Sequence, residues 1–339
     1  MMERGGASCG NHDRIGEAMK PTALRWFVES AISAGVPADQ LFAGLDVSYA
    51  ELQTASEIDI WSYSHIMHRV ALQSPAGQGR LCGEQFTCEK LGAIGLLMLT
   101  SATLHESTRS WHRYGALAQF PVFGHVQFGQ TEWRYHFGPT VPATESMWRF
   151  ATQALVACLS TLSAQICGKH LLYDRAELPY PQRSGDEAKL YSAREVRFGR
   201  PRAVLVGRLA ELDTPGNFAD DYANSTLMEH CEMALSAQRK NMSLHDRIIQ
   251  VFARTTSELP QIGELARELG SSTRTLQRNL AEEGLSYQKI TGEFRSKLLN
   301  LISEEPMVGP KETAYQLRFA NPNGVYRLRQ QRSGGGAIA

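Results

Sequence analysis

The stretch from Gln261 to Leu280 constrains the fold more than any other part of this 339-residue chain. Its apolar residues recur at helical spacing in two short runs, and a single glycine, Gly270, stands between them. Glycine adopts the left-handed backbone conformation at little cost, so Gly270 is expected to end the first helix and Ser272 to cap the second. The pattern predicts a helix-turn-helix.

The second of these helices is expected to carry long polar side chains on its outer face. Leu276 and Leu280 lie four residues apart and should point inward. Arg274, Gln277 and Arg278 then point outward. In the major groove, arginine matches O6 and N7 of guanine, and glutamine matches N6 and N7 of adenine. The stretch is therefore expected to bind DNA; the alternative is an ordinary helical hairpin with a solvated basic face.

A second unit of the same kind follows along the chain. Apolar spacing predicts a long helix over Tyr287–Glu304 and a short one over Lys311–Leu317. Asn321-Pro322 then places a capping residue before a proline at the first helical position, so a further helix is expected over residues 323–332. Two such units joined by one helix can reach successive major-groove segments on one face of DNA.

The charge distribution gives mild support for an anionic partner. The whole chain carries 35 basic and 35 acidic residues. Residues 244–339 hold 13 basic and 10 acidic side chains, a net charge of +3, which leaves −3 for residues 1–243. Because the excess is small, it favours nucleic acid only in combination with the helical pattern.

The remainder of the chain predicts a separate domain with both helices and strands, so the fold class is α+β. Polar residues at Gln238–Met242 mark the boundary, which gives an N-terminal domain over 21–237 and a DNA-binding domain over 243–334. Strands are expected at Val122–Phe128 and Thr131–Phe137, joined by a two-residue turn at Gly129-Gln130. Three short strands, at 171–173, 196–198 and 203–206, and two helices, at Glu145–Gly168 and 218–237, complete the prediction.

Neither end of the chain is expected to be structured, and no targeting segment is predicted. Residues 1–20 are polar and lack an apolar segment of signal-peptide type, so they are predicted to be disordered, and 335–339 form a short tail. No continuous apolar run reaches about 18 residues. The six cysteines show neither CxxC nor zinc-ligand spacing. A cytoplasmic protein with no membrane partner, metal or cofactor is expected.

The C-terminal part resembles the AraC/XylS family of transcription regulators over about 90 residues. The matching positions, in order, are Ile262–Leu269, Ser272–Leu280, Gly284, Phe294-Arg295, Leu298-Leu299, Ala314, Leu317, Phe319, Asn321-Pro322, Arg327 and Gly334. The N-terminal part is similar to the sensor domain of the subgroup that includes ornithine- and virulence-type regulators, chiefly over Leu91–Leu104. The resemblance implies DNA contacts by Arg274, Gln277, Arg278, Asn323 and Arg327. It also implies that residues 21–237 form an effector-binding and dimerisation domain.

The second helix-turn-helix departs from the family pattern at three positions. Arg318 stands where a turn glycine is usual, and Val325 and Arg329 stand where aromatic core residues are usual. A charged side chain in a core position is costly, so Arg329 must point outward or destabilise the unit. The second unit is therefore expected to be weakly folded alone or to contact only phosphates.

Several residues of the N-terminal part allow two interpretations. Trp133, Tyr135 and Phe137 share one strand face, which is ordinary core or the lining of an effector pocket. A solvated helix face or an acidic effector explains the polar residues Arg109, His112 and Arg113. Two further pairs are interpreted as packing residues. For His65 and His68 the alternative is a metal site, and for Cys82 and Cys88 it is a redox sensor. No catalytic grouping is predicted.

The sequence therefore predicts a non-enzymatic regulator, an activator or a repressor, that binds a double-stranded promoter operator. A small-molecule effector, a second copy of the chain and RNA polymerase are its expected partners. Two alternatives stay open: an enzyme with an appended DNA-binding module, and a ligand-independent dimeric DNA-binding protein. A deep polar-lined pocket would favour effector control over the second alternative.

Overall fold

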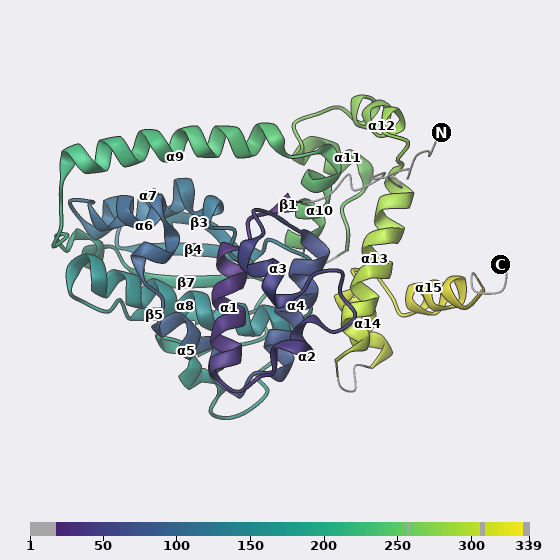
Figure 1. The fold of residues 1–339 in the computed structure, drawn as a ribbon, viewed down its shortest axis with the longest axis horizontal. Coiled ribbons are helices and arrows are strands. Elements are labelled where there is room, and N and C mark those ends of the chain that lie inside the picture. The colour runs from purple at the N-terminus through teal and green to yellow at the C-terminus, as the bar shows by residue number, and fades with distance from the viewer. Residues whose placement is uncertain (1–17, 256–257, 306–308, 335–339) are drawn as a thin grey trace, which may run out of the picture.

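A computed structural model describes residues 18–255, 258–305 and 309–334, without the side chains of residues 239–241 and 331–334. A mixed domain of helices and strands is followed by a helical C-terminal domain, which confirms the α+β class (Figure 1). Most of the segment predicted to be disordered, and the tail at 335–339, lie outside the described residues. Residues 18–20 contradict that prediction in part, because Ala18–Met19 forms a strand, β1, that pairs with β2 (Ile58–Asp59).

Nine helices are described in the N-terminal domain, and four of them surround the long helix α8. They are α1 (Thr22–Ser33), α2 (Ala38–Phe42), α3 (Tyr49–Thr54), α4 (Ile60–Gln73), α5 (Gln78–Glu84), α6 (Ala93–Leu99), α7 (Leu104–Tyr114), α8 (Glu145–Cys167) and α9 (Asp221–Asn241). Helix α8 contacts α4, α5, α6 and α7. Its contact with α5 is close because Gly83 has no side chain: a Cβ there would lie 2.2 Å from the carbonyl oxygen of Ala154.

A five-stranded sheet completes the N-terminal domain. Its strands lie in the order β3 (Val122–Phe128), β4 (Glu132–Pro139), β7 (Ala203–Arg208), β5 (Tyr173–Glu177) and β6 (Ala193–Arg197). Only β5 and β6 pair in parallel. The three short strands predicted from the sequence are thus present, with their bounds shifted by up to four residues. Trp133, Tyr135 and Phe137 lie on the buried face, as the alternation along β4 predicted.

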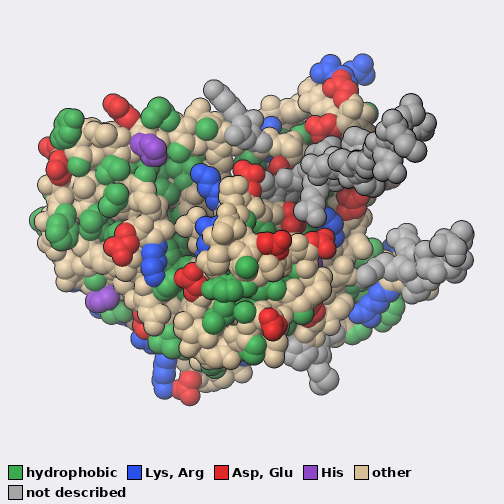
Figure 2. Space-filling view, in the orientation of Figure 1, with side chains coloured by type: hydrophobic (Ala, Val, Ile, Leu, Met, Phe, Trp, Pro, Cys, Tyr) green, Lys and Arg blue, Asp and Glu red, His purple; other side chains and the backbone are tan. Residues whose placement is uncertain are grey.

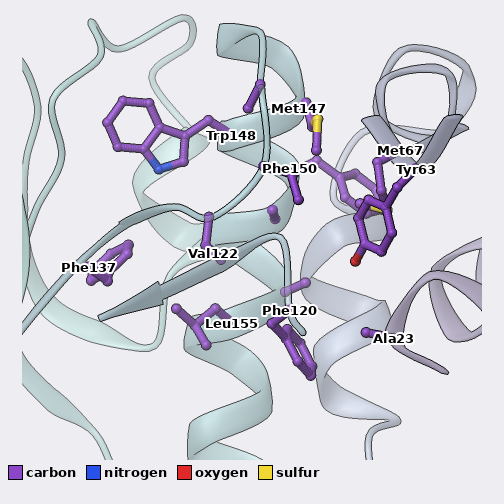
Figure 3. Close-up of a cluster of buried hydrophobic side chains, with 14 of the residues drawn as sticks. Ala23, Tyr63, Met67, Phe120, Val122, Phe137, Met147, Trp148, Phe150 and Leu155 are labelled. Carbon is purple, nitrogen blue, oxygen red and sulfur yellow. The ribbon is translucent and has the colours of Figure 1, made fainter. Parts of the chain in front are cut away.

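The core joins this sheet to the helices that precede it in the sequence. Figure 3 shows Phe137 and Val122 from the hairpin beside Leu155 and Phe150 of α8 and Tyr63 of α4. Helix α8 itself is apolar and long enough to cross a membrane, but 78% of its most hydrophobic window is buried inside the domain. That burial identifies α8 as the central core helix of the domain.

The β3–β4 hairpin differs from the prediction by one residue at its turn. Phe128 pairs with Trp133, and Gly129 N donates to Glu132 O at 2.8 Å, so the turn residues are Gln130 and Thr131. Gly129 does not have the positive φ that the predicted glycine-first turn requires. A tertiary contact holds the turn instead, because Leu209 N donates to Thr131 O at 2.9 Å.

The boundary predicted at Gln238–Met242 coincides with the end of a helix. Helix α9 continues to Asn241, and Ser243 caps the next helix, so only two residues separate the helices of the two domains. Polar residues there reflect an exposed helix end and not a loop. In Figure 1, α9 runs along the top of the molecule from the far side of the N-terminal domain to the C-terminal helices.

The C-terminal helices lie where the sequence predicted them. They are α10 (Leu244–Arg254), α11 (Ile262–Glu268), α12 (Thr273–Glu282), α13 (Tyr287–Ser303), α14 (Pro310–Gln316) and α15 (Asn323–Gly334). Gly270 and Gly284 have φ values of 69° and 68°, and the Ser272 hydroxyl accepts a hydrogen bond from Thr275 N at 3.1 Å. Local capping and glycine chemistry therefore determine the first helix-turn-helix.

Candidate DNA-binding surface and effector cavity

Helix α12 presents the predicted recognition residues to solvent. Leu276 and Leu280 are buried, while Arg274, Gln277 and Arg278 are exposed on the opposite face. Figure 2 shows basic side chains at this tip of the molecule, over α12. Arg278 pairs with Glu282 on the same helix at 3.5 Å. Exposed pairs of this kind contribute little, so the guanidinium remains available to a nucleic acid.

Helix α15 presents a second polar face. Asn323 and Arg327 are exposed, and the Asn321 side chain accepts a hydrogen bond from Asn323 N at 3.1 Å, as its predicted capping role requires. Val325 is buried, whereas Arg329 is exposed. Arg329 is thus turned outward, which answers the question that its position in the sequence raised.

Arg318 occupies the turn of the second unit in a left-handed conformation. Its φ is 61°, a value that favours glycine, and its side chain is only 6% exposed. The guanidinium donates to Gln316 O at 3.0 Å, while Nε has no partner among the described residues. Burial lowers the pKa of Arg318 to about 10. The departure from the family pattern therefore places a strained and buried arginine at this turn.

Arg295 of α13 supports the same turn from outside. Its guanidinium donates to Leu317 O at 3.2 Å and to Arg318 O at 3.1 Å, and it lies 4.1 Å from the centre of the Phe319 ring. Through Arg295, helix α13 thus holds the turn of the second helix-turn-helix unit. The N-terminal end of α13 directly follows the first unit in the sequence. Helix α13 therefore connects the two candidate helix-turn-helix units.

The C-terminal domain is docked on the N-terminal domain along α4. The Trp61 ring meets the Phe294 ring edge-on at 5.7 Å, and both side chains are buried. Further along, Arg69 pairs with Glu304 at 3.1 Å. An apolar contact at one end and an ion pair at the other hold α13 parallel to the face of α4.

The start of the core helix α8 forms a second contact between the domains. Glu145 N donates to Gln316 Oε1, and Ser146 N donates to Glu305 Oε1, both at 3.3 Å. A carboxylate is favoured at this position because the exposed N–H groups of a helix start carry partial positive charge. His68 lies beside it, with Nδ1 2.9 Å from Thr144 Oγ1, and burial lowers its pKa to about 4.

A cavity of about 40 Å³ lies inside the N-terminal domain. One wall is formed by α7 and the end of α8, through residues such as Leu104 and Leu162, and the opposite wall by Val126, Trp133 and Tyr135 of the sheet. Tyr135 is anchored there because Trp111 Nε1 donates to its hydroxyl at 3.3 Å. The space can hold about three water molecules.

Comparison with known proteins assigns this architecture. Residues 35–216, more than half of the chain, match the arabinose-binding N-terminal domain of AraC transcription regulators. The chain belongs to the AraC family of transcription regulators. It is therefore a DNA-binding transcription regulator with an N-terminal domain of the effector-binding kind, and the resemblance found in the sequence is confirmed.

Relatives of this AraC-family regulator carry names of the same kind. An uncharacterised helix-turn-helix transcriptional regulator of Mycobacterium tuberculosis is 23% identical over 81% of this chain and 82% of its own. The ornithine utilization regulator of Pseudomonas aeruginosa is 24% identical over 67% of each chain. The crystal structure of the regulator CdpR from Pseudomonas aeruginosa aligns with 93% of this chain and 96% of its own, with 15% identity and a TM-score of 0.48.

The other candidate residues of the regulator have structural roles. Arg113 pairs with Glu232 of α9 at 3.0 Å, and His112 Nδ1 accepts from Val126 N at 3.2 Å. Arg109, His112 and Arg113 therefore lie on a largely exposed helix face. His65 Nδ1 lies 2.9 Å from Trp61 O, which ties this ring to the turn before it.

Cys82, Cys88 and the apolar face of β4 also had two interpretations in the sequence. Burial raises the pKa of Cys82 to about 12 and that of Cys88 to about 11, which keeps both thiols protonated and unreactive. Trp133 and Tyr135 line the cavity, whereas Phe137 packs in the core. Sequence reasoning missed Ser107 and Tyr173, which line the cavity from α7 and β5, because no local pattern brings them together.

Proposed function

We propose that the regulator binds promoter DNA through α12 and α15, and that an effector held in the N-terminal domain alters this binding. Arg274, Gln277 and Arg278 read or clamp one major-groove segment, and Asn323 and Arg327 contact the next. The observation that carries the proposal is the exposure of these five side chains on the second helix of each of two helix-turn-helix units, which α13 connects. As a promoter-bound cytoplasmic protein, the regulator has RNA polymerase as its downstream partner.

The proposed regulator acts as a homodimer. Helix α9 supports this, since its outer face carries Tyr222 and Met233, which are 84% and 66% exposed. Exposed apolar side chains on one helix face are typical of a protein interface. The cavity in the N-terminal domain is small and mainly apolar, not the deep polar-lined pocket expected of an effector site; the match to an effector-binding family domain is what supports effector control over a dimer without a ligand. We infer no catalysis by the N-terminal domain.

The proposal is tested by mapping the sites that the regulator occupies across a genome and titrating one such site in a gel-shift assay. Arg278→Ala is expected to weaken binding by about 1–3 kcal/mol and to relax specificity at one base pair if Arg278 reads guanine. A phosphate contact predicts an equal loss on every sequence and a salt slope reduced by about one. Arg109→Ala is the matched control, because it removes an exposed charge remote from α12 and α15.

The outward position of Arg329 gives a separate test of the second unit. If Arg329 contacts a phosphate, Arg329→Gln lowers affinity and the salt dependence together, and Arg329→Phe does the same without raising the melting temperature. Unchanged DNA binding in variants of all five recognition residues, Arg274, Gln277, Arg278, Asn323 and Arg327, would refute the proposed DNA-binding surface.

A further inference from the structure

Three of the residues that line the cavity of the N-terminal domain each carry a buried polar atom without a protein partner. Among the described residues, these atoms are Ser107 Oγ on α7, Trp133 Nε1 on β4 and the Tyr173 hydroxyl on β5. All three side chains are at most 3% exposed. Buried polar groups in native proteins are nearly always hydrogen-bonded, and an unpaired one is destabilising. Three of them around one space indicate a site that a polar group of a ligand completes.

The unpaired groups specify what that ligand must offer. The indole nitrogen of Trp133 can only donate a hydrogen bond. Burial raises the pKa of Tyr173, so its hydroxyl keeps the proton and can donate as well. The ligand must therefore bring an acceptor oxygen or nitrogen to the space between Trp133 and Tyr173, whose rings meet edge-on at 5.7 Å.

The remaining lining excludes an ionised ligand. None of the described residues that line the cavity carries a charged side chain. Apart from the hydroxyls of Thr108 and Ser163, the other lining residues are apolar or aromatic. A carboxylate or ammonium group in such surroundings would lose its hydration without gaining an ionic partner. An amino acid with ionised groups therefore does not fit this site.

We propose that this cavity is the effector site and that the effector is a small, neutral, largely apolar molecule with a carbonyl or hydroxyl oxygen. The inference rests on the proposed effector-controlled function and adds the ligand class. At about 40 Å³, the present space accepts only the smallest such molecules. A larger effector has to move α7 away from the sheet.

Movement of the cavity wall would reach the DNA-binding domain through the start of α9. Leu104 N, at the start of α7, donates to Thr214 O at 3.0 Å, and Asn217 N donates to Ile166 O of α8 at 2.8 Å. The segment that begins α9 is thus hydrogen-bonded to both helical walls of the cavity. Because α9 leads to α10 almost without a break, a displaced wall shifts the attachment of the C-terminal domain (Figure 1).

The test uses the full-length protein and cyclopentanone, a neutral probe with one carbonyl oxygen that is larger than the present space and therefore binds only if α7 moves away from the sheet. The chain has five tryptophans, so five indole N–H signals are expected in a ¹H–¹⁵N correlation spectrum. Cyclopentanone is expected to shift the Trp133 signal, which Trp133→Phe identifies, and to raise the melting temperature. Cyclopentylammonium, of the same ring but charged, is expected to do neither.

Variants locate the probe within the chain. Tyr173→Phe is expected to weaken cyclopentanone binding about five- to tenfold without lowering the melting temperature of the free protein, since it removes only an unpaired hydroxyl. Trp133→Phe is expected to weaken binding similarly but to lower the melting temperature, because it shortens a buried ring. Trp148→Phe is the matched control, because the Trp148 indole N–H is also buried and unpaired but lies outside the cavity (Figure 3).

Three results would overturn the ligand assignment: no shift of the Trp133 signal at any probe concentration, equal binding of cyclopentylammonium, or equal weakening by Trp148→Phe. A gel-shift assay on the same proteins distinguishes failure of the ligand assignment from failure of the proposed DNA-binding function. Probe binding without DNA binding would refute the regulator's proposed DNA-binding surface but leave the ligand site standing. DNA binding without probe binding would do the reverse.

Discussion

Replacing Arg318 by glycine is expected to stabilise the second helix-turn-helix. The left-handed backbone at φ 61° costs a non-glycine residue about 1–2 kcal/mol. The charge adds to this, because burial lowers the pKa from 12.5 to about 10, which corresponds to about 3 kcal/mol against the charged form at neutral pH. Arg318→Gly removes both costs.

Two losses oppose this gain. Glycine has more freedom in the unfolded chain, which costs about 1 kcal/mol. The guanidinium also gives up its hydrogen bonds to Gln316 O, at 3.0 Å, and Tyr315 O, at 3.4 Å, together about 2 kcal/mol. The expected net gain is about 1–2 kcal/mol. Arg318→Ala removes the buried charge and its hydrogen bonds but keeps the left-handed strain, so it is expected to gain only about 1 kcal/mol.

Amide hydrogen exchange over α14 and α15 is the suitable assay, because all five tryptophans lie in the N-terminal domain. Protection in Arg318→Gly should exceed that in Arg318→Ala by about 1 kcal/mol. Equal protection in the two variants would refute the argument from backbone strain. Loss of protection in both would show that the hydrogen bonds of Arg318 outweigh its burial.

Three further outcomes are expected. His68 has a folded-state pKa of about 4, below its usual 6.5, so the stability of the folded protein falls as the pH drops below 6.5 and the buried ring must be protonated. Between pH 7.5 and 5, urea titration should show the free energy of unfolding dropping by about 2 kcal/mol more in the natural protein than in His68→Gln. Gly207→Ala should lower the free energy of unfolding by about 1–3 kcal/mol, because the added Cβ would lie 2.7 Å from the Trp133 ring. Gly138→Ala is the control: its Cβ would have nothing within 4 Å, so thermal melting should show little change. Residues 243–339 alone should bind DNA in a gel shift, but more weakly than the full chain; no binding at low salt would contradict an independent DNA-binding domain.

The C-terminal half was predictable because its determinants are local. Gly270 and Gly284 have the left-handed φ values that their positions require, and Ser243 and Ser272 cap the helices that follow. Each of these caps and turns depends only on residues that lie within about one helical turn of each other in the sequence. Helix bounds in this half therefore follow from the sequence to within one or two residues.

The effector cavity was not predictable because its determinants are distant in the sequence. Ser107, Trp133 and Tyr173 come from three different elements, and only the sheet order β4-β7-β5 places the last two on one face. The alternation along β4 did identify Trp133 and Tyr135 as inward residues. It could not distinguish a packed core from a cavity, since that depends on which side chains from α7 and α8 lie opposite.

The two ends of α8 connect the cavity with the second helix-turn-helix. Its first N–H groups bind Glu305 and Gln316 of the C-terminal domain, and Ser163, near its other end, lines the cavity. Seventeen residues of helix, roughly 25 Å, separate Ser146 from Ser163 and transmit displacement because a buried helix is stiff. The unit at the receiving end carries the strained Arg318, so it is an element of low stability that a shift of α8 can order or release. Under the proposed function, the departure of Arg318 from the family pattern would keep the second proposed DNA contact dependent on the state of the N-terminal domain.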